Sequence, residues 1–424
     1  MRAGPGLKPS LTISCKGLLA PPPVRESGLR NASRMTILAL CAALCATPSL
    51  GQESNEDAAD DADATSGIDW SVALRGSYAS NTVTGGTAGL SLAPEASLTL
   101  GGESSVSRLS AGSELVVNGV GGARVSDIHA GAESSYRLGA TTLLDGAIAG
   151  SLTQADPNDS GLPVNTLSAP LVLDGTVRGS VTQDLDKVDL KLTLDGERLM
   201  EGPTTLDDMS TVDNSHESYW QGGATLRVGY ELTPLLSAFV EGEASVQKFD
   251  APSPTLLKYL DGRTYQLRAG LSYVQGSIIA AEASFGRAWL DYIDGTINDT
   301  QSWVYNGSVT FKPDETVSLV GSLETTLGPS AGVPGDTDIG YALDGTARYG
   351  INPWLTLRGT AGWDQTVTLG TNDVSWGYRA GMGLDYQGSR HIVWTGDFLY
   401  SRDYAPPAPV SDTYTVTVGV KVQR

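Results

Sequence analysis

The chain has 424 residues and a formal net charge of −20, and it contains 51 glycines but only 5 phenylalanines. Such a negative balance argues against binding to nucleic acid or to an anionic membrane surface. The excess of glycine over large apolar residues fits a curved sheet with a wet interior better than a densely packed soluble core.

The N-terminal segment has the features of an export signal. An apolar run from Met35 to Ala46 follows several arginines and precedes a small-residue site that ends at Gly51. This run is too short to span a membrane as a helix. We therefore expect residues 1–51 to be a cleaved signal peptide. Its translation start is uncertain, because the stretch before Met35 is unusually long.

The residues after this signal have two properties that follow from composition. All three cysteines, Cys15, Cys41 and Cys45, lie within the signal, so we expect no disulfide and no cysteine-based metal or redox site in the exported protein. Residues 52–66 (QESNEDAADDADATS) carry many carboxylates and no basic group, which predicts a disordered acidic tail.

From residue 68 onward, apolar and polar residues alternate with a period of two. The segment 412–423 shows the pattern: its apolar face holds Tyr414, Val416, Val418, Val420 and Val422, and its polar face holds Thr413, Thr415, Thr417, Gly419 and Lys421. One apolar and one polar face in every segment is typical of membrane-spanning strands, which meet lipid outside and water inside. The sequence therefore predicts an all-β fold.

About eighteen such segments follow one another along the chain. Their expected bounds are 68–80, 87–99, 104–117, 124–137, 141–154, 169–183, 187–200, 217–231, 236–249, 263–274, 277–291, 301–312, 315–327, 339–351, 353–367, 374–387, 390–403 and 412–423. We expect them to form one transmembrane antiparallel up-and-down β-barrel of 16–18 strands over residues 67–424.

The connections between the segments alternate in length. Short ones lie at 232–235, 275–276, 313–314, 352 and 388–389, and longer ones at 155–168, 201–216, 250–262, 292–300, 328–338 and 404–411. This alternation indicates short periplasmic turns and longer extracellular loops, with an even number of strands. Aromatic pairs on the apolar faces predict two interfacial girdles; they are Trp376 and Tyr386, Tyr265 and Tyr273, and Tyr341 and Tyr349.

Several stretches resemble those of a known family. They are Tyr78–Asn81 at the end of the first strand, Phe239–Asp250 (FVEGEASVQKFD), Tyr265–Tyr273, and Ile279–Tyr292 (IAAEASFGRAWLDY). In these the chain resembles the β-barrel porins of proteobacterial outer membranes, and the likeness covers most of residues 68–424. The resemblance implies a barrel in the outer membrane, with outer-membrane lipid, lipopolysaccharide and the barrel-assembly machinery as partners. It implies no particular substrate.

The chain departs from this family at its last residues, Val422-Gln423-Arg424. Outer-membrane proteins usually end in an aromatic residue that the assembly machinery recognises. The alternating valines and Tyr414 are the candidates for that role here. The sequence leaves the oligomeric state open.

Few residues have the properties that an enzyme needs. The three histidines, His129, His216 and His391, share no metal-ligand spacing. Ser218 lies two residues from His216, but a polar loop pair explains this better than a catalytic dyad. Acidic loop residues could hold Ca²⁺ between neighbouring lipopolysaccharides, but solvated loop charge is the preferred interpretation; they are Asp156, Asp159, Asp207, Asp208, Asp213, Asp336 and Asp338. We expect no enzyme, no metal and no cofactor.

Charged residues fall mainly on the polar faces of the strands. A charge that faced lipid at mid-membrane would cost about 2–4 kcal/mol, so we expect these side chains to point inward. The pore-lining candidates are Arg178, Lys191, Arg227, Arg268, Arg348, Arg358, Arg379, Glu241, Glu243, Asp344 and Asp397. They either line a pore and set its ion preference, or form ion pairs that fill and brace the cavity.

The function that fits this pattern best is a porin-like channel for passive diffusion of small solutes or ions. A barrel of about eighteen strands is wide enough to leave an aqueous channel. The alternative is a non-conducting structural or assembly barrel, associated for example with the export of a surface polysaccharide.

Overall fold

The computed structural model describes residues 67–82, 85–118, 122–157, 162–163, 165–330, 337–370, 373–406 and 409–424. The expected signal peptide and acidic tail lie outside these residues. Within them, no helix has the length and apolar character needed to cross a membrane.

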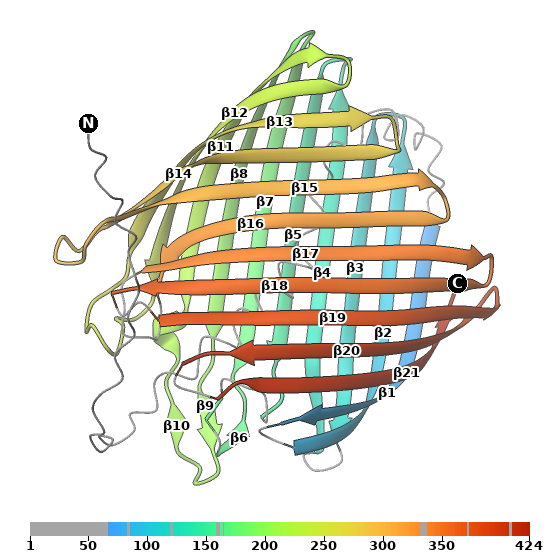
Figure 1. Ribbon diagram of the computed structural model, residues 1–424, viewed down its shortest axis with the longest axis vertical. Helices are drawn as coiled ribbons and strands as arrows, with labels where there is room; N and C mark the ends of the chain where they lie inside the picture. Colours follow the sequence, from blue (N-terminus) through green and yellow to red (C-terminus); the bar gives the residue numbers. More distant parts are fainter. Residues whose placement is uncertain are drawn as a thin grey trace, which may run out of the picture.

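The described residues form a closed antiparallel barrel of 18 strands, as the sequence predicts (Figure 1). Closure occurs where β1 (Gly67–Asn81) pairs with β2 (Gly85–Gly102) on one side and with β21 (Ser411–Gln423) on the other. The remaining barrel strands are β3 (Ser105–Asn118), β4 (Gly122–Leu138), β5 (Thr142–Gln154), β7 (Leu171–Leu185), β8 (Val188–Glu201), β11 (Tyr219–Thr233), β12 (Leu236–Phe249), β13 (Gly262–Gln275), β14 (Ile279–Tyr292), β15 (Thr300–Asp314), β16 (Val317–Pro329), β17 (Thr337–Asn352), β18 (Leu355–Leu369), β19 (Asp373–Ser389) and β20 (Ile392–Tyr404).

The two ends of the barrel differ. All connections at one end are tight turns, such as 234–235 and 315–316, and we call this the short-turn end. The longer connections lie at the opposite, long-loop end, although 82–84, 119–121 and 370–372 there are short too. The chain passes from one end to the other in each strand, so the predicted alternation is confirmed.

Two of the long connections contain secondary structure that the sequence analysis treated as loop. The connection after β5 contains β6 (Thr166–Ser168). The one after β8 contains β9 (Thr204–Leu206), β10 (Thr211–Val212) and the short 3₁₀ helix η3 (Ser215–Glu217). The three short strands form a separate small sheet in the order β10-β9-β6, seen at the lower edge of Figure 1.

The two faces of the wall have opposite polarity. In β21, Tyr414 and Val416 are each 47% exposed and Val418 is 61% exposed, although all three are apolar. Exposed leucines, valines and aromatic residues continue this outward face around the barrel, while polar side chains alternate with them on the inward face. A lipid bilayer stabilises a barrel whose outer surface is apolar and whose interior is polar.

The ladder between β15 and β16 stops before it reaches the long-loop end. Their pairing runs from the short-turn end only as far as Gly307 and Leu323. Beyond this point β16 turns away from β15 and pairs only with β17, up to Pro329 and Thr337 (Figure 1). The long-loop half of β15 therefore pairs with β14 alone.

At this place the barrel wall overlaps itself. Leu327 and Thr337 have the outward register of β16 and β17, yet they contact inward-facing residues of β14 and β15. Leu327 packs in one apolar cluster with Leu290 and Val304, and the Thr337 hydroxyl lies 3.0 Å from the Tyr292 hydroxyl. We call this region the wall overlap. It places the ends of β16 and β17 inside the bore at the long-loop end.

Candidate functional site

One group of inward-facing charges spans β11 to β14. The Arg227 guanidinium donates to both carboxylate oxygens of Glu282, at 2.9 and 2.8 Å, and lies 3.9 Å from Glu241. Arg268 forms an ion pair with Glu241 and lies 3.8 Å from Glu243. Two arginines and three glutamates thus form a connected chain with a formal net charge of −1, which we call the β11–β14 cluster.

An aromatic ring holds part of this cluster against the wall. The Arg227 guanidinium carbon lies 3.6 Å from the centroid of the Phe239 ring, which is inward-facing and only 4% exposed. The ring itself covers Gly270, where a β-carbon would clash with it. Arg227 therefore gains a cation–π contact and lies along the wall instead of projecting into the bore.

A second group of charges spans β17 to β20. Arg358 donates to Asp385 through Nε and Nη2, both at 2.9 Å, and its Nη2 lies 2.8 Å from Asp397. Arg379 forms an ion pair with Asp344. We call this group the β17–β20 cluster.

The charged side chains of the β17–β20 cluster lie directly over glycine residues of the barrel wall. A β-carbon at Gly383 would clash with the Asp397 carboxylate and lie 3.1 Å from the Arg358 guanidinium carbon. One at Gly362 would meet the guanidinium of Arg379. The charged side chains thus lie flat across glycine positions, which keeps their bulk out of the bore.

The other predicted lining residues stand apart from these clusters. Arg178, Lys191 and Arg348 have the inward register of β7, β8 and β17 and are exposed. None of the three forms an ion pair within the described part of the chain. Arg348 is the ladder partner of Arg358, yet only Arg358 has carboxylate partners.

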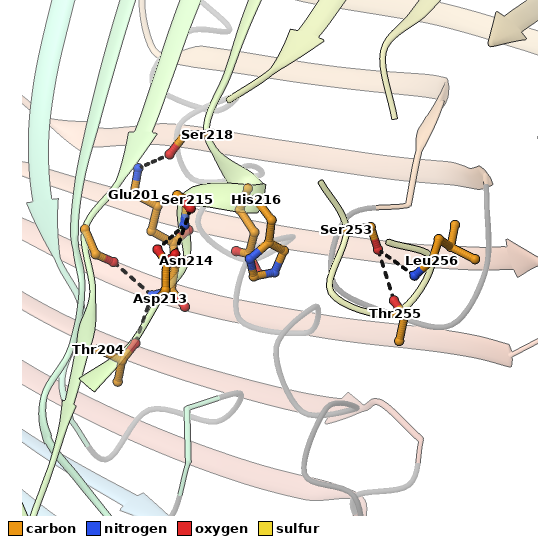
Figure 2. A network of polar contacts seen from close by, with 12 residues as sticks. Glu201, Thr204, Asp213, Asn214, Ser215, His216, Ser218, Ser253, Thr255 and Leu256 are labelled. Atoms are coloured by element: carbon orange, nitrogen blue, oxygen red, sulfur yellow. Dashed lines mark hydrogen bonds and ion pairs between the residues drawn. The ribbon is translucent and has the colours of Figure 1, made fainter. Parts of the chain in front are cut away.

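A network of polar contacts organises the connection between β8 and β11 at the long-loop end (Figure 2). The Asn214 side-chain amide, which is 2% exposed, donates to the Gly202 carbonyl at 2.9 Å and to the Thr204 hydroxyl at 3.0 Å. The Ser215 backbone N–H and hydroxyl both donate to Asp213 and lower the pKa of its carboxyl group. This connection is therefore a built structure.

The same network shows which groups Ser218 and His216 contact. The Ser218 hydroxyl accepts a hydrogen bond from the Glu201 backbone N–H at 2.9 Å, and His216 Nε2 lies 3.2 Å from Glu217. The two groups serve different partners, unlike a nucleophile and its base. Of the acidic loop residues, Asp156 pairs with Arg124 at 3.2 Å. No group of three or more potential metal-ligating side chains occurs in the portion that the structure describes.

Sequence reasoning missed two parts of the lumen. Phe239 has an inward register, but a lone aromatic on a polar face gives no sign of a stacked arginine. The wall overlap gave no signal either, because Thr325 and Leu327 continue the same alternation as the strand before them.

A family model supports a barrel of this kind. The family model described as "Putative beta-barrel porin 2" matches residues 95–424. Among solved structures, the chain is similar to OpdL of Pseudomonas aeruginosa, with 13% identity and a TM-score of 0.43 over 85% of this chain and 99% of that chain. It is also similar to OccAB4 of Acinetobacter baumannii, with 11% identity and a TM-score of 0.40 over 84% and 98% of the two chains.

A mutant of the ferric enterobactin receptor PfeA of Pseudomonas aeruginosa is similar as well, with 9% identity and a TM-score of 0.43 over 85% and 81% of the two chains. Identities and TM-scores this low carry no argument about what this chain binds. No curated protein matches the chain.

Proposed function

The chain belongs to this beta-barrel porin family, and we propose that its outer-membrane channel passes small hydrophilic solutes and ions along a mixed-charge lining that favours cations. Passage is by passive diffusion, without a chemical step or a cofactor. Arg178, Lys191 and Arg348 and the two ion-pair clusters line the passage.

The observation that carries this proposal is the way the arginines are neutralised. Arg227, Arg268 and Arg358 each lie within 4 Å of two carboxylates, so little of their positive charge reaches the bore. Low-dielectric walls focus the field of whatever charge remains unpaired, so it acts more strongly in a bore than on an open surface.

The remaining unpaired charge is mainly negative on β7 and β8. The inward positions there include four carboxylates, from Asp174, Asp189, Asp195 and Glu197, and two cations, from Arg178 and Lys191. None of the four carboxylates forms an ion pair with another described residue. A bore with this excess attracts cations and repels anions of similar size.

The wall overlap supports a rival function, the non-conducting barrel, because it brings the ends of β16 and β17 into the bore. If these ends closed the passage, the ion pairs would only brace the wall. The flat arrangement of the clusters over Gly383 and Phe239 favours an open passage instead.

Conductance measurements test the proposal. Purified protein in a planar bilayer should give discrete current steps, and a KCl gradient should give a reversal potential of the sign expected for cation preference. Protein that is folded but gives no steps would establish the non-conducting barrel. Steps with an anion-selective reversal potential would refute the assigned lining while leaving the channel in place.

A further inference from the structure

The outward face of the barrel carries an unusual group of cations near the long-loop end. Arg198 on β8, Lys248 on β12, Arg263 on β13 and Arg287 on β14 all have the register of the lipid-facing residues. We call these four residues the outer basic patch. They are conspicuous in a chain whose formal net charge is −20.

Three members of the patch lie close together at one height. Arg198 is the ladder partner of Trp220, which is in turn the partner of Lys248. Arg263 pairs with Val246, two residues below Lys248. These three cations lie 10 to 12 residues from the short-turn ends of their strands. At ~3.3 Å per residue and a tilt of ~40°, this height is roughly 25–30 Å, which is the upper edge of the apolar band.

Two exposed tryptophan rings lie at this level or just below it. The Arg198 guanidinium carbon lies 4.9 Å from the Trp220 ring, and that of Arg287 lies 5.0 Å from the Trp303 ring. Both tryptophans are strongly exposed, at 60% and 50%. Exposed tryptophan is typical of the boundary between hydrocarbon and headgroups, so Arg198, stacked on Trp220, lies at headgroup level. Arg287, which is 8 residues from the short-turn end of β14, lies just below that level.

Elsewhere at this level, the outward-facing residues named below are apolar or form a neutral ion pair. On β2 to β7 the corresponding outward positions are apolar and exposed; they include Leu90, Val117, Val125 and Leu173. On β20 and β21 the pair of Arg402 and Asp412, 3.8 Å apart, is neutral. The unbalanced positive charge is therefore confined to the arc from β8 to β14.

Only part of this charge is neutralised by the protein. Asp250 accepts a hydrogen bond from Arg198 at 2.9 Å, and Asp291 is the ladder partner of Arg263. Four cations thus face two carboxylates. An outward cation at the edge of the membrane needs an anionic partner, and the phosphates of lipid headgroups lie at this height. The guanidinium fork and the ammonium group both bind phosphate well.

We propose that the outer basic patch binds the phosphate groups of a phosphorylated glycolipid of the outer leaflet. Arg198, Lys248 and Arg263 contact the phosphates, while Trp220 and Trp303 border the acyl chains. This assignment depends on the outer-membrane location and not on conduction.

Lipid binding by the folded barrel in detergent tests the proposal. The probes are bisphosphorylated lipid A and the same lipid with both phosphates removed. The wild-type protein should prefer the phosphorylated form, and the preference should weaken as salt is raised. The triple variant Arg198→Gln, Lys248→Gln, Arg263→Gln should bind phosphorylated lipid A about tenfold more weakly or worse.

Two further variants make the test specific. The control Arg178→Gln, Lys191→Gln, Arg348→Gln removes the same charge from the lumen and should leave lipid binding unchanged. Asp250→Asn releases Arg198 from its carboxylate and should raise the affinity, which tests the patch even if the triple variant folds poorly. For each variant, a difference in gel mobility between the unheated and the heated sample identifies folded protein.

Three results would overturn the assignment. The first is equal affinity for the two lipids. The second is full competition by inorganic phosphate, which would indicate a site for the free ion. The third is a triple variant that changes from oligomer to monomer while its lipid affinity stays the same, because the patch would then be an interface between copies of the chain.

Discussion

The Thr325 hydroxyl takes the place of a strand partner for Tyr305. It accepts a hydrogen bond from the Tyr305 backbone N–H at 3.1 Å and donates one to the Tyr305 carbonyl at 2.9 Å. This occurs just where the ladder between β15 and β16 ends, in a wall that would otherwise leave both backbone groups without a partner. Unpaired backbone groups are costly in a membrane protein.

Replacing Thr325 with valine keeps the shape but removes both hydrogen bonds. We expect the barrel to lose about 1–3 kcal/mol of stability, because the N–H and carbonyl of Tyr305 are then left unsatisfied. The midpoint of urea unfolding in lipid vesicles measures this. Thr326→Val is the matched control, since Thr326 is exposed on the opposite face of β16 and should change the midpoint little.

Arg358 and Arg348 offer a direct comparison of a paired and an unpaired cation. Either change to glutamine removes one positive charge from the bore. Arg358→Gln also releases Asp385 and Asp397, whereas Arg348→Gln releases no carboxylate. We therefore expect the larger increase in cation preference for Arg358→Gln. Reversal potentials in a KCl gradient measure the difference, and equal shifts would show that releasing Asp385 and Asp397 adds nothing to the loss of one positive charge.

Gly286 on β14 lies against the backbone of β13. An added β-carbon would clash with the Leu267 carbonyl and lie 2.7 Å from the Arg268 Cα. Because both obstacles are backbone atoms, Gly286→Ala should force the strands apart and cost about 1–3 kcal/mol. Gly242→Ala on β12 is the control, since nothing lies within 4 Å of its added carbon. Unfolding midpoints that match for the two variants would contradict the clash.

Asn214 connects the two sides of the long connection after β8. Asn214→Ala removes its donors to Gly202 and Thr204 and should loosen the segment 202–218 without unfolding the barrel. Limited proteolysis should then cut this segment several times faster than in the wild type. Ser210→Ala, in the same segment but at an exposed Ser210–Asp208 contact, should leave the rate nearly unchanged. A similar rate for both would show that Asn214 does not hold the segment.

The barrel was predictable because its governing pattern is local. Strand β12 has the expected bounds, Leu236–Phe249, and the other strands differ by a few residues at most. Alternation of period two fixes which residues face inward, so the register of Arg227 and Arg268 followed directly from the sequence.

The partners of these residues were not predictable in the same way. Arg227 binds Glu282, which lies three strands away in the barrel order. That contact depends on the stagger between non-adjacent strands, which no local pattern encodes. The wall overlap was not predictable for a similar reason. A strand that overlaps its neighbour and a strand that pairs with it show the same alternation of apolar and polar residues.

The overlap makes the barrel a tapered tube. At the short-turn end all the strands share the circumference, whereas at the other rim two strand ends lie behind their neighbours and shorten the perimeter. In the channel proposed above, resistance to a diffusing solute is then concentrated at that rim, far from some of the charges to which we assign ion selection. Speed of passage and choice of ion can therefore be altered separately by substitutions at opposite ends of the tube.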